Sequence, residues 1–285
     1  MSKVKEYRNR IKSVGNIKKI TKSMQMIAVS KMRKAERTAK VGKAYHENIE
    51  QMFRIISKDI ELMKNPLFFT RESGKKLIIV FSPSRGFAGN MMISELNAFY
   101  QGTKGYEKEQ LDAIIIGKKL KRYVAGKVNS IIADFSGIGE YPTIQEIRGI
   151  SQIVLEEYRK GTYNEIYVLY TDYINSLHQQ TRFVKLLPAL LDASPKVSIS
   201  DKERDFVFEP ERSTIIDSLV SLYIDNSLYQ FKAETVASEF AARMTAMKDA
   251  TDKAESLGDE LKLELNKLRQ DIITRELGEI SAGTL

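Results

Sequence analysis

Residues 1–65 carry apolar or small side chains at the spacing of a helical stripe. Most steps between them are three, four or seven residues, which is the repeat of a coiled-coil seam. No proline interrupts the stretch, and the helix should end at Asn65, because a residue before proline resists the helical region. A helix of about 60 residues would reach roughly 90 Å. The stripe consists of Tyr7, Ile11, Val14, Thr21, Met24, Ala28, Ala35, Thr38, Gly42, Tyr45, Ile49, Met52, Ile56 and Met63.

Residues 209–285 show the same pattern. Pro210 suits the first turn of a helix, and no later proline follows it. Neither long helix could bury its stripe on a compact middle domain alone, so the pattern predicts that the two pair as an antiparallel coiled coil. The second stripe consists of Ile216, Leu219, Tyr223, Val236, Phe240, Met244, Met247, Ala254, Leu261, Leu265, Leu268 and Ile272.

Small residues make this seam thin in places. Two interpretations stay open: close approach of the two helix backbones, or simply the high helix propensity of alanine. The residues concerned are Ala28, Ala35 and Gly42 on the first helix, and Ala250, Ala254 and Gly258 on the second.

Residues 66–208 alternate short apolar runs with amphipathic stretches, which favours a mostly parallel sheet covered by helices. The last strand follows a short connection through Asn175, so we expect an antiparallel edge. The predicted fold is α/β with long terminal helices: an antiparallel coiled coil plus a Rossmann-like α/β domain. The expected strands are 76–82, 113–117, 130–135, 165–173 and 181–188, and the expected helices are 90–100, 118–125 and 143–160.

Charge is concentrated at the N-terminus. The chain of 285 residues has a net charge of +8, yet residues 1–43 hold fourteen basic residues against Glu6 and Glu36. Four interpretations compete: a solvated helix face, a nucleic-acid surface, a surface for an acidic protein, or a transit peptide. The helical pattern continues far beyond a transit peptide, so we expect the N-terminus to belong to the mature fold. No apolar run is long enough to span a bilayer.

Catalytic and metal-binding chemistry has few candidates. There is no cysteine, and the two histidines, His46 and His178, are expected at the surface. The loop Ser82–Asn90 follows a strand and opens a helix, where open α/β sheets often hold phosphate. It lacks the glycine spacing of a dinucleotide site and the lysine of a P-loop, so nucleotide binding is a minor alternative. No cofactor is expected.

The C-terminal end is unusually apolar for a helix tip. Helix ends normally fray unless something holds them. The pattern therefore predicts a hydrophobic socket on another subunit, which would hold Ile272, Ile273, Leu277 and Ile280.

Three segments together resemble the gamma subunits of F-type ATP synthases, and the resemblance extends over the full length. They are Ile20–Lys34, Ser238–Asp252 and Asn266–Leu277. The resemblance implies a central shaft, itself non-catalytic, inside a ring of three α and three β subunits. The α/β domain would stand on the c-ring together with the epsilon subunit. Ion flow would turn the shaft and drive the catalytic sites on β through their conformations, reversibly with ATP hydrolysis.

The resemblance also assigns contact residues. Arg269, Gln270 and Thr274 match tail positions that touch a β-subunit loop. Met24 and Arg243 match positions near the acidic lever loop of β, which Lys22, Lys31 and Arg33 would also face. Glu209 matches a position near the c-ring, and the apolar tip would be held in the sleeve of the ring.

The chain departs from the family in one loop. Ser84 stands where the family usually has aspartate, and Phe87, Ala88 and Asn90 replace leucine, cysteine and glycine. The expected source is bacterial and the expected location is the cytoplasmic face of the plasma membrane, as a peripheral subunit. A basic coiled coil that binds nucleic acid, or a nucleotide-binding α/β protein, is the alternative function.

Overall fold

The computed structural model describes residues 2–56, 67–68, 71, 73–188 and 212–283. They group into two units. One unit holds residues 31–242, and the other joins the N-terminal residues up to 30 with those from 243 onward. Each unit is described by itself below.

Two long helices were predicted, and both are present. Helix α1 covers Ser2–Ile56 and helix α5 covers Arg212–Gly283. The predicted helix end at Asn65 and helix start near Glu209 lie outside the described residues. Among the helices that the structure describes, none has a stretch long and apolar enough to cross a membrane.

In the unit formed by residues up to 30 and from 243 onward, α1 and α5 run antiparallel. The hydroxyl of Thr251 lies 2.8 Å from that of Thr21, and Lys18 Nζ lies 2.8 Å from Glu255 Oε1. The predicted seam is confirmed here, since Ala28, Ala254 and Leu261 are all buried. A Cβ built on Gly258 would lie 3.7 Å from Val14 Cγ1, which is an ordinary van der Waals distance, so this position would also accept alanine.

The unit of residues 31–242 is built on a five-stranded sheet with the strand order β3-β2-β1-β4-β5. Strands β1 to β4 are parallel, and β5 pairs antiparallel with β4, as the short connection predicted. The strands are rich in β-branched residues, and β2 is buried at every position. Their bounds are Lys75–Phe81 (β1), Leu111–Ile116 (β2), Ser130–Asp134 (β3), Tyr163–Tyr173 (β4) and Gln179–Leu187 (β5).

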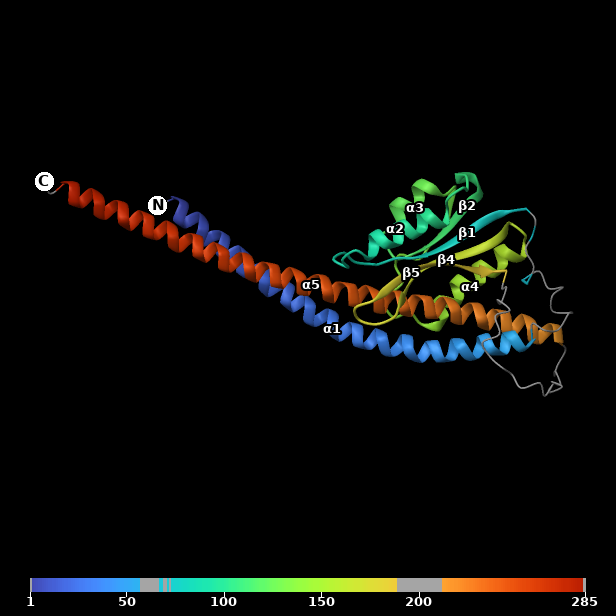
Figure 1. Ribbon diagram of the computed structural model, residues 1–285. Helices are drawn as coiled ribbons and strands as arrows, with labels where there is room; N and C mark the ends of the chain where they lie inside the picture. Colours follow the sequence, from blue (N-terminus) through green and yellow to red (C-terminus); the bar gives the residue numbers. More distant parts are fainter. Residues whose placement is uncertain (1, 57–66, 69–70, 72, 189–211, 284–285) are drawn as a thin grey trace. The chain divides into compact units, whose positions relative to one another are not determined.

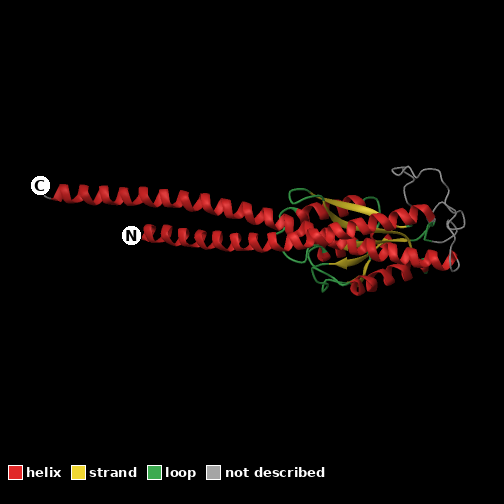
Figure 2. Ribbon diagram, turned by 90° about the horizontal axis from the view of Figure 1, so that it is seen from below, coloured by secondary structure: helices red, strands yellow, loops and turns green. Residues whose placement is uncertain are grey.

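Helices cover both faces of the sheet (Figures 1 and 2). On one face, α2 (Met91–Gly102) and α3 (Lys121–Lys127) bury Phe99 and Val124 against β1 and β2. On the other face, α4 (Ile144–Arg159) packs together with the early part of α5, where Val220, Ile224 and Leu228 are fully buried. A short 3-10 helix, Lys108–Gln110, precedes β2. This three-layer arrangement confirms the predicted Rossmann-like α/β domain.

Helix α4 shows how the local sequence sets an element boundary. Its N-cap, Thr143, accepts a hydrogen bond from the backbone N–H of Glu146, whose own side chain reaches back to the N–H of Thr143. This reciprocal capping box satisfies two N–H groups that a helix start leaves open. It also fixes the end of the loop that contains Glu140, Tyr141 and Pro142.

Candidate partner-binding surfaces and the seat of α5

The far end of α5 extends past the start of α1. The antiparallel pairing of Thr21 with Thr251 and Lys18 with Glu255 places Ser2 opposite about residue 270, because each step along α1 is matched by one step back along α5. Figure 1 shows the C-terminal end of α5 reaching beyond the N-terminal end of α1 in this unit. The residues that follow Gln270 are therefore available to another chain.

Side chains at this tip face outward. Ile273 is 50% exposed and Leu277 is 62% exposed, while Ile272 is half-buried. The three polar positions assigned to a β-subunit contact, Arg269, Gln270 and Thr274, are all exposed. The side chain of Ile280 lies outside the described residues. Exposed apolar side chains between exposed polar ones have the character of a protein contact, and their assignment to partner loops stays a prediction.

The second assigned group in this unit surrounds the middle of the seam. Met24 is half-buried in the seam, and Lys22 is exposed, with its ammonium donating to Gln25 Oε1 at 3.2 Å. Arg243 is only 6% exposed. A partner could reach Lys22 freely but only the edge of Arg243, so the two cations differ in how they could serve a contact.

Lys31 and Arg33 belong to the other unit and also differ from each other. Arg33 is exposed, whereas Lys31 lies 2.6 Å from Glu140 Oε2 and 5.3 Å from the ring centroid of Phe240. The hydroxyl of Tyr141 donates to the carbonyl oxygen of Lys31 at 3.1 Å. The sequence pattern gave no reason to pair Lys31 with Glu140, which is 109 residues away.

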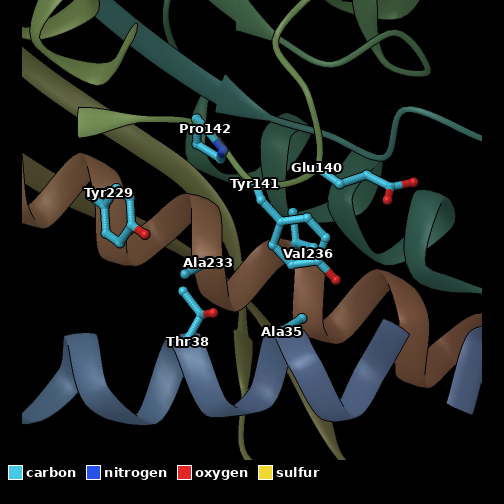
Figure 3. A pocket seen from close by; sticks show the side chains of 8 residues that line it. All are labelled: Ala35, Thr38, Glu140, Tyr141, Pro142, Tyr229, Ala233 and Val236. Atoms are coloured by element: carbon cyan, nitrogen blue, oxygen red, sulfur yellow. The ribbon is translucent and has the colours of Figure 1, made fainter. Parts of the chain in front are cut away.

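We call residues 140–142, together with their contacts to α1 and α5, the clamp. Tyr141 projects from its loop toward both helices, and Ala35 and Thr38 of α1 face Ala233 and Val236 of α5 beneath it (Figure 3). Lys34 Nζ lies 4.5 Å from the ring centroid of Tyr141. A small pocket remains, lined by Ala35, Thr38, Glu140, Tyr141, Pro142, Tyr229, Ala233 and Val236. The small alanines let the two helices approach while the clamp covers them.

Further along this unit, the seam includes a residue that we did not expect. His46 was predicted at the surface and Tyr45 in the seam, and the structure reverses both. Tyr45 is 52% exposed, whereas the His46 ring is half-buried and lies 5.9 Å from the Tyr223 ring centroid. The seven-residue repeat itself holds, since Ile49, seven residues after Gly42, is buried. The structure uses the position four residues after Gly42, where the prediction took the one three residues after it, and both steps fit a heptad.

The crevice at the carboxyl ends of the strands is where doubly wound sheets bind their ligands. Here α2 and α3 cover one face and α4 the other, so the winding direction reverses between β1 and β4. Helix α5 fills this position. The hydroxyl of Thr235 accepts from the backbone N–H of Thr171 at 3.4 Å, and the hydroxyl of Ser238 donates to the Thr171 carbonyl at 3.1 Å.

The loop Ser82–Asn90 contributes to the same place. The backbone N–H of Ser84 donates to Glu239 Oε2 on α5 at 3.3 Å. The chain's own carboxylate thus occupies the position in which such a loop could hold an anion, which argues against the nucleotide-binding alternative. Phe87 in this loop is 71% exposed and adopts a left-handed conformation with a φ of 63°.

Buried ionisable groups lie near the crevice that α5 fills. Glu95 on α2 is fully buried and accepts a hydrogen bond from the Thr171 hydroxyl at 2.9 Å, and burial raises the pKa of its carboxyl well above the ordinary value. Burial likewise raises the pKa of Glu234 to about 7, although a hydrogen bond from Gln230 opposes it. Burial lowers the pKa of Lys232. Burial thus shifts the pKa of each of these groups in the direction of its neutral form.

Comparison with known proteins matches the whole chain. A family model described as ATP synthase matches residues 3–284. The ATP synthase gamma chain of Dechloromonas aromatica (strain RCB) is 36% identical over 281 residues, covering 98% of this chain and 97% of the relative. The ATP synthase gamma chain of Nitrosomonas europaea is 36% identical over 293 residues, covering 99% of both chains.

Solved structures share the fold at lower identity. A chain of the Euglena gracilis mitochondrial ATP synthase in rotational state 3 is 15% identical with a TM-score of 0.66, over 99% of this chain and 94% of that one. A central-stalk chain of the Tetrahymena thermophila mitochondrial ATP synthase is 19% identical with a TM-score of 0.62, over 81% of this chain and 99% of that one.

Proposed function

The chain belongs to the ATP synthase gamma-chain family and serves as the central shaft of that complex, and we propose that it couples rotation of an ion-driven c-ring to conformational change at catalytic sites on β subunits. The observation that carries this function is the antiparallel pair of long helices attached to an α/β domain, over a family match of residues 3–284. ATP hydrolysis would drive the same rotation in reverse.

The proposed partners surround the two long helices and the α/β domain. Three α and three β subunits would enclose the helix pair, and the epsilon subunit and c-ring would contact the α/β domain. Arg269, Gln270 and Thr274 would touch one β loop, and the apolar tip formed by Ile272, Ile273, Leu277 and Ile280 would turn in the sleeve of the ring. The exposure of Ile273 and Leu277 supports this placement. Glu209, proposed to lie near the c-ring, is outside the described residues.

The acidic lever loop of β is the proposed partner of Met24, Lys22, Arg33 and Arg243. Exposed ion pairs contribute about 0–1 kcal/mol each, so such contacts could exchange as the shaft turns. Steric pushing by the helix pair would then supply most of the coupling. Lys31 was assigned to the same group, but its pairing with Glu140 supports a role within the chain as well.

The chain would itself be non-catalytic, with ATP chemistry performed on β. We place the complex at the cytoplasmic face of a bacterial plasma membrane, with this chain as a peripheral subunit. The match to gamma chains of bacteria such as Dechloromonas aromatica supports that location.

Co-purification tests the proposal. The tagged chain, expressed with the α and β subunits of its own genome, should elute as one complex containing three of each per chain. That complex should hydrolyse ATP, whereas α and β without the chain should be far less active. A chain that elutes alone, binds DNA in a salt-sensitive manner and leaves α and β unchanged would support the nucleic-acid alternative instead.

A further inference from the structure

Strands β1 and β4 separate where they meet α5. Their pairing ends with Val80 opposite Leu169, and β1 itself ends at Phe81. Strand β4 continues to Tyr173 with β5 as its neighbour on the other side. Thr171 therefore lies beyond the last β1 partner, and its backbone needs other hydrogen-bonding groups on that side.

Helix α5 supplies those groups to Thr171. The Thr235 hydroxyl accepts from the Thr171 N–H, and the Ser238 hydroxyl donates to the Thr171 carbonyl. Both side chains are almost completely buried, at 1% and 0% exposure. Two helix side chains thus satisfy a strand backbone in the way that a neighbouring strand would.

The same face of α5 reaches the other side of the split. Glu239, which is 5% exposed, accepts from the Ser84 N–H in the loop after β1. Residues 235, 238 and 239 are spaced i, i+3 and i+4, so they lie together on one face of the helix. From α2, Glu95 accepts from the Thr171 hydroxyl and so also bonds to the residue that this face contacts.

These contacts differ in kind from the rest of the α5 packing. Val220, Ile224 and Leu228 make apolar contacts, which are non-directional and tolerate small rotations. Hydrogen bonds depend steeply on angle, and a rotation or slide of α5 would break all three together. Because the site is buried, water molecules cannot readily replace these hydrogen bonds once they are broken.

We propose that Thr235, Ser238 and Glu239 are positioning residues that form the joint through which torque passes between α5 and the α/β domain, in the crevice that related folds use for ligands. This inference rests on the proposed function of the chain as a shaft. The joint would resist twisting of α5 against the sheet while the c-ring turns the α/β domain.

The test separates torque transfer from folding. One variant combines Thr235→Val, Ser238→Ala and Glu239→Ala, and a second carries Glu239→Ala alone. The controls are Thr235→Ser, which keeps the hydroxyl, and Glu239→Gln, which keeps an acceptor oxygen. Each is measured as ATP hydrolysis by the α–β–chain complex, and as ions pumped per ATP by the complete complex in vesicles.

ATP hydrolysis without the c-ring puts no torque on the joint, so its rate should stay within about two-fold of the wild type. Ions pumped per ATP should fall by about five-fold or more in the combined variant, and by less in Glu239→Ala. The two controls should pump normally. Unchanged pumping per ATP, or pumping and hydrolysis that fall in parallel, would overturn the joint. A wild-type chain that does not couple at all would instead overturn the shaft function.

Discussion

Lys31 on α1 and Glu140 in the loop before α4 form an ion pair, with Nζ 2.6 Å from Oε2. Their side chains are 33% and 20% exposed, so water still screens the pair in part. Arg85 Nη2 approaches the other oxygen of Glu140 at 3.9 Å. Lys31 was predicted to face a partner subunit, but here it binds a loop of its own chain. We therefore expect the pair to contribute mainly to the stability of the chain.

The clamp should therefore contribute modestly to stability. We expect Lys31→Ala to lower the free energy of unfolding of the isolated chain by about 0.5–1 kcal/mol, because a partly exposed pair is worth little. Coupled ATP synthesis should survive the change. Arg33→Ala, at an exposed neighbouring position, is the control and should have no effect. A double-mutant cycle with Glu140→Ala measures the pair directly, and a coupling energy of zero at low salt would contradict the clamp.

Glu234 should make stability depend on pH. Its carboxyl has a pKa of about 7 in the folded chain against an ordinary value of 4.5. A raised carboxyl pKa means that the folded state holds a proton which the unfolded state loses. The stabilisation is thus complete below about pH 4.5 and lost as the pH rises toward 7.

The substitution Glu234→Gln removes this dependence while keeping an oxygen that can accept from Gln230. We expect the variant to exceed the wild type by about 2–3 kcal/mol at pH 8 and to match it near pH 4.5. Urea unfolding at a series of pH values measures the difference. A gap that stays constant across the series would show that the Glu234 carboxyl does not titrate as described.

Two glycines of α1 should respond in opposite directions to alanine. A Cβ at Gly42 would lie 2.3 Å from Gln230 Oε1, whose amide also donates to the Ala39 carbonyl at 3.0 Å. Displacing this buried side chain should outweigh the gain in helix propensity, so Gly42→Ala should destabilise the chain by about 1–2 kcal/mol.

Gly15 is the matched control, because a Cβ there meets nothing within 4 Å. Gly15→Ala should stabilise the chain by about 0.5–1 kcal/mol through helix propensity alone. Both changes are measured by thermal unfolding of the isolated chain. A stabilised Gly42→Ala variant would mean that the helices do not need this close approach.

The apolar tip should matter for assembly and not for the chain's own fold. Leu277→Asp alters a side chain that is 62% exposed, so the unfolding free energy of the isolated chain should change by less than about 0.5 kcal/mol. Affinity for the α and β subunits should fall, which sedimentation of mixed subunits would measure. Glu276→Ala, one residue away and exposed, should assemble normally. Equal assembly by both variants would remove the tip from the proposed interface.

The elements of the fold could be predicted well from the sequence, and their junctions could not. The five strands lie within two residues of their expected bounds, because buried runs such as Ala113–Ile116 within β2 are apolar throughout. The seam of α1 follows the predicted seven-residue steps as far as Ile49, but between Gly42 and Ile49 it uses His46 in place of Tyr45. Steps of three and of four residues both fit a heptad, so periodicity alone could not choose between the neighbouring positions Tyr45 and His46.

The hydrogen bonds of the joint had no signal in the sequence, although Ser238 and Glu239 begin one of the segments that resemble gamma subunits. Thr235, Ser238 and Glu239 are ordinary polar residues in a helix, and their partners Thr171 and Ser84 use backbone groups, which every sequence has. The clamp was missed for a related reason, since Glu140 belongs to a loop with no periodicity. By contrast, the exposed tip was expected from composition alone, and its partner contacts remain predictions.

The pairing of Thr21 with Thr251 joins positions 230 residues apart in the chain. During synthesis, α1 leaves the ribosome long before α5, the helix with which it pairs, has been made. Its apolar stripe is exposed to water in that interval. The dense positive charge around the stripe opposes association with other nascent chains, because like charges repel. We therefore expect the basic N-terminus to reduce association of the chain during synthesis, before any partner subunit is present.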